Sequence, residues 1–129
     1  PVDAHGYLDG GKIPADSLLT LQVANGETGI RQDLEKLAAR ARMVVLDATY
    51  SGTRIPLGDR WDGAIFSANA WGGPSGISVM AISNPSQWRY PLPHIAPIRT
   101  PGGYSLPLLL GAAVAIENFS EDPQRIDGI

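Results

Sequence analysis

The spacing of hydrophobic residues predicts one amphipathic helix in the first half of the chain. Over residues 29–42, apolar residues recur with the spacing that places them on one side of a helix: Ile30, Leu34, Leu37, Ala38 and Ala41. Asp33 and Glu35 lie near its expected N-terminal end, and Arg40 and Arg42 near its C-terminal end, as the helix dipole favours. A single helix cannot bury such a stripe by itself, so we expect it to pack on a sheet.

Three segments predict strands because they are rich in β-branched residues or alternate apolar with polar positions. They are MVVLDATY (43–50), GAIFSAN (63–69) and GISVMAIS (76–83). The segment YSLPLLLGAAVAIENF (104–119) predicts two further strands joined by a bend at Gly111. The expected fold is therefore α+β, with one domain over residues 1–129 and one amphipathic helix packed on a mixed or antiparallel sheet.

Glycine and proline divide the chain into short elements. The passage PLPHIAPIRTP (91–101) predicts a stiff extended arm or loop, because proline cannot donate a hydrogen bond to a sheet. Residues 1–17 are expected to be extended or looped, and the polar residues 120–129 to form a flexible tail.

Composition excludes several classes of function. The formal net charge is −3 and the cationic residues are scattered, so we expect neither nucleic acid nor an anionic membrane as a partner. The chain has no cysteine, which excludes disulfides, thiolate zinc sites and a cysteine nucleophile. Its longest apolar stretch, 106–116, is shorter than the ~20 residues that cross a bilayer.

The N-terminus predicts a protein without a secretion signal, since no positively charged leader precedes a hydrophobic segment. Pro1 fits a complete small protein whose initiator methionine has been removed. Proline at that position also serves as a general base in tautomerases, but the residues after Pro1 make a poor strand, so we expect an exposed, processed terminus.

Three segments, GGKIPADSLLTL (10–21), GIRQDLEKLAARAR (29–42) and VVLDATYSG (44–52), resemble the opening of the M15 (VanY-like) peptidoglycan peptidases of actinobacteriophage lysins. The resemblance implies a related fold for the first half of the chain. That family needs a zinc ion held by His, Asp or Glu ligands beside an activated water. The segments here that are most similar to the family's ligand motifs, 73–83 and 85–90, contain no histidine. The resemblance therefore implies a copy without catalytic or metal-binding residues.

Other candidate chemistry is equally weak. His5 and His94 are the only histidines, and a metal site from His5 with Asp3 and Asp9, or from Asp59 and Asp62 with a histidine, lacks a regular ligand pattern. The segment GGPSGIS (72–78) lacks the spacing of a serine nucleophile elbow and predicts a turn. We expect no catalytic, cofactor-binding or metal-binding residue, no cofactor, and no enzyme activity.

Large side chains in glycine- and proline-rich surroundings predict contact surfaces, because aromatic residues bury much area at low entropic cost. The interface candidates are Trp61, Trp71, Trp88, Tyr90, Pro93, Ile95, Ile98, Tyr104 and Leu108. The alternatives are that the aromatic residues cover a small core, or that they stack on carbohydrate.

The sequence thus predicts a non-enzymatic structural or interaction protein that works in an oligomeric assembly with copies of itself or with other virion proteins. The preferred hypothesis is a small bacteriophage virion component, such as a capsid decoration, connector or tail protein, made in the host cytoplasm and located in the virion. The alternative is a catalytically dead peptidase-like domain that binds cell-wall peptide or glycan through Tyr50, Arg54 and nearby aromatic residues.

Overall fold

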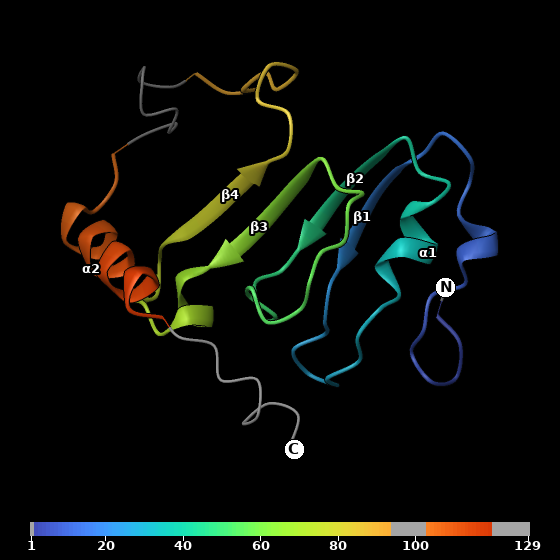
Figure 1. Cartoon of the computed structure of the whole chain (residues 1–129), viewed down its shortest axis with the longest axis horizontal. Coiled ribbons are helices and arrows are strands. Elements are labelled where there is room, and N and C mark those ends of the chain that lie inside the picture. Colours follow the sequence, from blue (N-terminus) through green and yellow to red (C-terminus); the bar gives the residue numbers. More distant parts are fainter. Residues whose placement is uncertain (1, 94–102, 120–129) are drawn as a thin grey trace.

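The computed structural model describes residues 2–93 and 103–119. They form a four-stranded mixed sheet with helices, an α+β fold in one small domain, as the sequence predicts (Figure 1). The strands are β1 (Leu18–Gln22), β2 (Met43–Asp47), β3 (Gly63–Ser67) and β4 (Ser78–Ile82). The helices are α1 (Leu34–Ala38) and α2 (Leu106–Glu117), with short 3-10 turns η1 (Gly10–Lys12) and η2 (Ala68–Trp71).

The sheet has the strand order β1-β2-β3-β4, so neighbours in sequence are neighbours in space. β1, β2 and β3 are parallel, and β4 returns antiparallel to β3. The carboxyl ends of the three parallel strands therefore meet at one edge of the sheet (Figure 1).

One face of the sheet carries the main core. Alternate strand residues such as Leu21, Val44 and Leu46 pack with Leu37 of α1 in one buried cluster. The sequence predicts this alternation in β2, where Val44 and Leu46 are almost completely buried. Because successive side chains of a strand point to opposite faces, the remaining residues of each strand lie on the face of the sheet away from α1.

The helix predicted over residues 29–42 is shorter in the structure, because its first residues are used to join loops. Arg31 forms a bridge with Ala24, and the side chain of Gln32 hydrogen-bonds the backbone of Gly6 and Leu8. The helix begins only after Asp33, whose side chain accepts a hydrogen bond from the backbone N–H of Lys36 (3.1 Å). The predicted stripe is nevertheless buried from Leu34 through Ala41.

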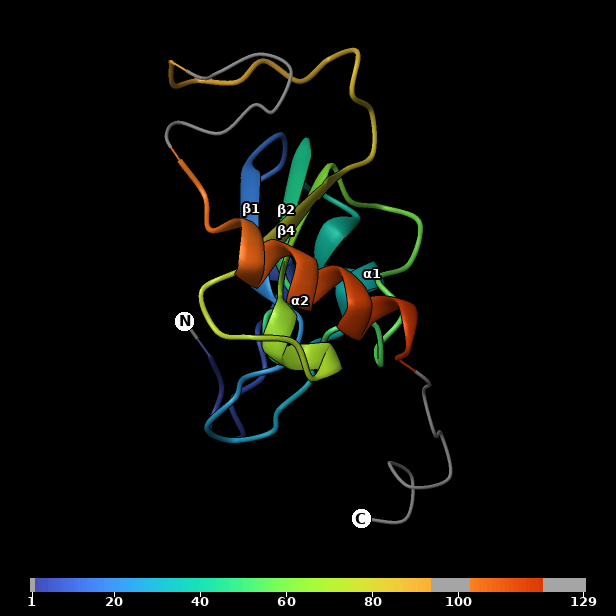
Figure 2. The same ribbon diagram turned by 90° about the vertical axis from the view of Figure 1, so that its left-hand side faces the viewer.

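The prediction of two strands over residues 104–119 is wrong, because this segment forms helix α2. Pro107 lies in the first turn, where a missing backbone N–H costs nothing. The segment is apolar at nearly every position, so it has neither helical nor strand periodicity for sequence reasoning to detect. Figure 2 shows α2 running across the end of the molecule formed by β4.

Strand β1 was not predicted from the sequence. In the structure β1 pairs with β2 in parallel, with Leu18 beside Met43. Most of the predicted proline-rich arm and all of the predicted tail fall on residues 94–102 and 120–129, outside the described residues. Among the described residues, no helix has the length and apolar character needed to span a bilayer.

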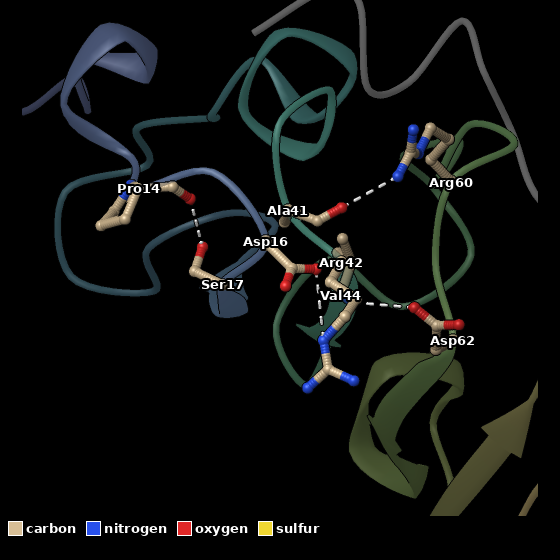
Figure 3. A network of polar contacts seen from close by, with 8 residues as sticks. All are labelled: Pro14, Asp16, Ser17, Ala41, Arg42, Val44, Arg60 and Asp62. Atoms are coloured by element: carbon tan, nitrogen blue, oxygen red, sulfur yellow. Dashed lines mark hydrogen bonds and ion pairs between the residues drawn. The ribbon is translucent and has the colours of Figure 1, made fainter.

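Two side chains of the loop before β3 fasten it to β2 and to the end of the α1 segment (Figure 3). Asp62 accepts a hydrogen bond from the backbone N–H of Val44 at 2.8 Å. The guanidinium of Arg60 donates to the backbone oxygen of Ala41 at 3.0 Å. These bonds satisfy backbone groups at the amino end of β2 that its strand neighbours leave unpaired, and so they fix the start of the parallel pair.

Candidate functional site

Polar side chains follow the carboxyl ends of all three parallel strands. They are Asn25 after β1, Asp47, Thr49 and Tyr50 at and after β2, and Ser67 and Asn69 at and after β3. In open sheets with parallel strands, ligands bind in the crevice outside these carboxyl ends. This edge is therefore the candidate functional site.

The last residue of β2 organises the turn that follows it. The carboxylate of Asp47 accepts hydrogen bonds from the backbone N–H of Thr49 (3.0 Å) and from its hydroxyl (2.7 Å). Because Asp47 lies beside Ile65 in the register, its side chain is on the face of the sheet opposite α1. The half-buried carboxylate places a negative charge directly behind the Thr49 hydroxyl.

A hollow of about 400 Å³ lies at this edge. Its lining residues come from the turns after β2 and β3 and from the start of β4: Thr49, Tyr50, Arg54, Ser67, Asn69, Ala70 and Ser78. They supply hydroxyls, an amide and a guanidinium but no carboxylate. Known small-molecule pockets have volumes of about 300–1,000 Å³, so the hollow is large enough for a small ligand.

The wall formed by β3 and η2 is held by short-range hydrogen bonds. The Ser67 hydroxyl accepts from the backbone N–H of Asn69 (3.4 Å), and the Ser75 hydroxyl donates to the amide oxygen of Asn69 (3.3 Å). η2 ends at Gly72, whose φ of 77° is a left-handed conformation that glycine adopts without strain. The Asn69 side chain is thus fixed at the rim.

The turn after β1 reaches the same place. The Asn25 side-chain oxygen accepts from the backbone N–H groups of Glu27 and Thr28, both at 3.0 Å, which closes the turn. A Cβ atom on Gly26 would lie 2.5 Å from the ring of Tyr50, so only glycine allows this turn to rest against the ring. The exposed phenol is therefore held between the hollow and the β1 turn.

Arg54 supplies the positive charge of the hollow. Its guanidinium carbon lies 5.3 Å from the centre of the Phe119 ring, a cation–π contact with a residue two positions after the end of α2. Ser51, in the same turn, is buried, and its hydroxyl has no hydrogen-bond partner among the described residues. A buried hydroxyl without a protein partner is a polar group that a water could satisfy.

The structure distributes the predicted interface residues widely and does not gather them at this edge. Trp71 is buried in the chain's own second core with Ala112, and half-buried Trp61 packs against the main core. Trp88 lies along the face of the sheet opposite α1. The remaining positions are Tyr90, half-buried; Pro93, Tyr104 and Leu108, exposed; and Ile95 and Ile98, outside the described residues.

The polar residues considered as metal ligands have local roles. Asp3 accepts hydrogen bonds from the backbone N–H groups of His5 and Tyr7 (2.8 and 2.9 Å), and Asp62 accepts one from the backbone N–H of Val44. Within residues 2–93 and 103–119, no three His, Asp or Glu side chains converge as a metal site would need. His94 lies outside these ranges.

Two lining residues of the hollow, Tyr50 and Arg54, were named from the sequence in the cell-wall binding alternative. The lining residues Ser67 and Asn69, and Asp47 behind Thr49, were missed. The missed residues lie near the carboxyl ends of the predicted strands 43–50 and 63–69. That position would have been a usable signal, had the strands been predicted to be parallel.

No family model and no curated protein matches this sequence. The solved structures that are similar to it include the following two. One, described as SspA in complex with cysteine, has a TM-score of 0.75 and 25% identity, and the match covers 94% of this chain and 40% of that chain. The other, described as a NifS-like protein, has a TM-score of 0.71 and 26% identity, covering 91% of this chain and 36% of that chain. This chain therefore has a fold found within two much longer proteins, and it spans less than half of either.

Proposed function

We propose that this chain binds a small α-amino acid of about the size of cysteine in the hollow at the carboxyl edge of the sheet. The observation that carries the proposal is the convergence of Arg54, Ser67 and Asn69 on one hollow, from turns after two neighbouring parallel strands. The similarity to SspA, whose structure contains cysteine, supports an amino acid as the ligand.

The lining residues match the charges of an amino acid. The Arg54 guanidinium can pair with the ligand carboxylate through two parallel hydrogen bonds. The hydroxyls of Thr49 and Ser67 can accept hydrogen bonds from the ammonium group, and the Asp47 carboxylate behind Thr49 favours a positive charge there. A cation on one wall and an anion behind the other would orient the ligand.

Size selects a short side chain. The hollow is at the small end of the range of ligand pockets, and Ala70 in its lining is packed closely enough that a Cβ on Gly52 would lie 2.8 Å from it. A thiol or hydroxymethyl group could also find polar partners in Asn69 and Ser78. We therefore expect cysteine and serine to bind more tightly than leucine or phenylalanine.

Isothermal titration calorimetry with L-cysteine, L-serine and L-leucine tests this proposal. Arg54→Gln should weaken binding of L-cysteine at least about tenfold, because a hydrogen bond to a charged group contributes roughly 1.5–3 kcal/mol. Arg89→Gln, at an exposed arginine outside the hollow, is the matched control. Equal binding by the two variants, or no binding of any amino acid at millimolar concentration, would contradict the proposal.

An assembly role remains a second proposal, favoured by one observation. Helix α2 is apolar on nearly all sides, yet Leu110 and Val114 are each 58% exposed. Helices that are apolar all round are normally buried in a larger body. In the virion component proposed from the sequence, α2 would form part of the contact between copies or with another virion protein.

Sedimentation velocity checks this second role. The chain should form a concentration-dependent oligomer that Leu110→Glu disrupts and that Lys12→Glu, at an exposed position on η1, leaves unchanged. Recovery of the chain from purified virus particles would support the virion proposal. Retention on purified peptidoglycan would instead favour the cell-wall binding alternative.

A further inference from the structure

The face of the sheet opposite α1 is apolar, and no helix within residues 2–93 and 103–119 covers it. We call it the open face; its apolar side chains are Leu18, Met43, Val45, Ile65, Met80 and Ile82. Leu18 is 57% exposed and Met80 46% exposed, while Val44 and Leu46 on the other face are almost completely buried.

The strand register makes these side chains one continuous surface. Leu18 lies beside Met43, and Ile65 lies opposite Met80. Gly63 separates Val45 from Ile82, and this gap contributes to a hollow of about 100 Å³ that Trp88 also lines. Within the four described strands, Asp47 at the carboxyl edge is the one charged side chain on this face.

Parallel strands rarely leave such a face in water. Sheets with parallel strands occur with helices on both faces, whereas antiparallel sheets commonly have one solvated, polar face. Here β1, β2 and β3 are parallel, but α1 lies on one face alone (Figure 1). The exposed apolar side chains of the open face therefore need a covering element.

We propose that the open face is the docking surface for an amphipathic helix from the part of the SspA-like fold that this chain does not span. Two longer proteins contain this fold, and more than half of each of them lies outside the match. The helix would present aliphatic side chains to the sheet and fill the hollow between Val45, Ile82 and Trp88 with one of them.

A helix fits this surface better than the sheet of a second copy does. Packing of sheet on sheet is the arrangement of antiparallel sandwiches, while parallel strands are covered by helices. A helix lying over β2 and β3 would also leave the polar carboxyl edge accessible, since Ser67 and Ser78 lie beyond the last apolar pair of the open face, Ile65 and Met80.

The natural absence of cysteine allows a direct test. Met80→Cys and Val79→Cys each introduce a single thiol at adjacent positions of similar exposure (46% and 43%) on opposite faces of β4. The labelling rate of each thiol with a maleimide is measured for the chain alone, at several concentrations. It is measured again after addition of a recombinant fragment of SspA that contains the part of SspA outside the match.

Addition of the SspA fragment should slow labelling at position 80 at least about tenfold and leave position 79 unchanged, as expected where a side chain reacts only after a local opening. In the unlabelled chain, Met80→Glu should abolish co-elution with the fragment, and Val79→Glu should not. Circular dichroism of both Glu variants confirms that they are folded.

Three results would overturn the proposal. Equal protection of both positions would mean that the fragment does not lie on the open face. Protection of position 80 in the chain alone that rises with concentration would make a second copy the occupant. Absence of protection at position 80 under every condition would show that the open face is not a docking surface for this fold. None of these results depends on an amino acid bound at the carboxyl edge.

Discussion

The indole nitrogen of Trp71 donates a hydrogen bond to the backbone oxygen of Ala112, 3.3 Å away. Both residues are buried, with 6% and 5% of their surfaces exposed. Trp71 belongs to η2, next to the candidate site, and Ala112 is the one buried residue of α2. This pair therefore connects the helix that follows residues 94–102 to the wall of the hollow.

Removal of the Trp71 side chain should release α2. Trp71→Ala is expected to lower the free energy of unfolding by roughly 3–5 kcal/mol, the usual cost of deleting a large buried aromatic side chain. Helical circular dichroism and urea unfolding measure the effect. Leu109→Ala, at an exposed position of α2, should cost much less. Equal losses in the two variants would mean that Trp71 does not anchor the helix.

Asp62 should contribute to stability through one backbone hydrogen bond. Asp62→Ala leaves the N–H of Val44, a residue that is almost completely buried, without its acceptor. An unsatisfied buried donor costs about 1–3 kcal/mol. Urea unfolding should show this loss for Asp62→Ala, whereas Asp59→Ala at an exposed neighbouring position should stay within ~0.5 kcal/mol of the parent chain.

Gly26→Ala separates an effect on the site from an effect on the fold. The added Cβ would lie 2.5 Å from the Tyr50 ring, so the ring must move. Because that ring is 65% exposed, it can rotate away with little loss of stability. We expect the melting temperature to change little and the affinity for L-cysteine to change measurably. Gly103→Ala, where an added Cβ meets open space, is the control.

Asp3 gives the N-terminal loop a dependence on pH. Hydrogen bonds from the backbone N–H of Tyr7, and secondly of His5, lower the pKa of Asp3 below its ordinary value of 3.8. A carboxyl whose pKa is lower in the folded state stabilises that state above its unfolded pKa, and the stabilisation is lost as the pH falls through the folded pKa. The protection factor of the Tyr7 amide, its exchange rate relative to that of an unstructured amide at the same pH, should therefore decrease as the pH falls below 3.8.

An NMR titration of the Asp3 carboxyl carbon, with exchange of the Tyr7 amide, measures this effect. Asp3→Asn retains a side-chain acceptor but cannot titrate, so the acid-dependent change in the protection factor of the Tyr7 amide should disappear. A titration midpoint at or above 3.8 would contradict the assignment.

Local patterns predicted the parts of the fold that local interactions determine. The alternation in β2 and the buried stripe from Leu34 to Ala41 were readable, because each repeats with the period of its element. Helix α2 was misread as two strands, since an apolar segment such as LPLLLGAAVAI carries no period. Its one buried residue, Ala112, contacts Trp71, which is far away in the sequence.

The candidate site could not be predicted from the sequence for a related reason. Tyr50 and Arg54 were noticed as large side chains in a turn, but Ser67 and Asn69 join them only because β3 is parallel to β2. Strand direction depends on pairing across the sheet, which no short segment specifies. The resemblance to M15 peptidases has no finding for or against it and stays a prediction.

Because Arg54 of the hollow contacts the Phe119 ring, ligand binding at the carboxyl edge can be detected at a residue outside the hollow. A ligand carboxylate that draws the guanidinium toward itself would take the cation away from the ring face, so occupancy and aromatic stacking would compete for one side chain. A fluorinated phenylalanine at position 119 would then report filling of the hollow through its resonance, without touching the ligand. The segment just after α2 would thus respond to ligand binding at the carboxyl edge of the sheet.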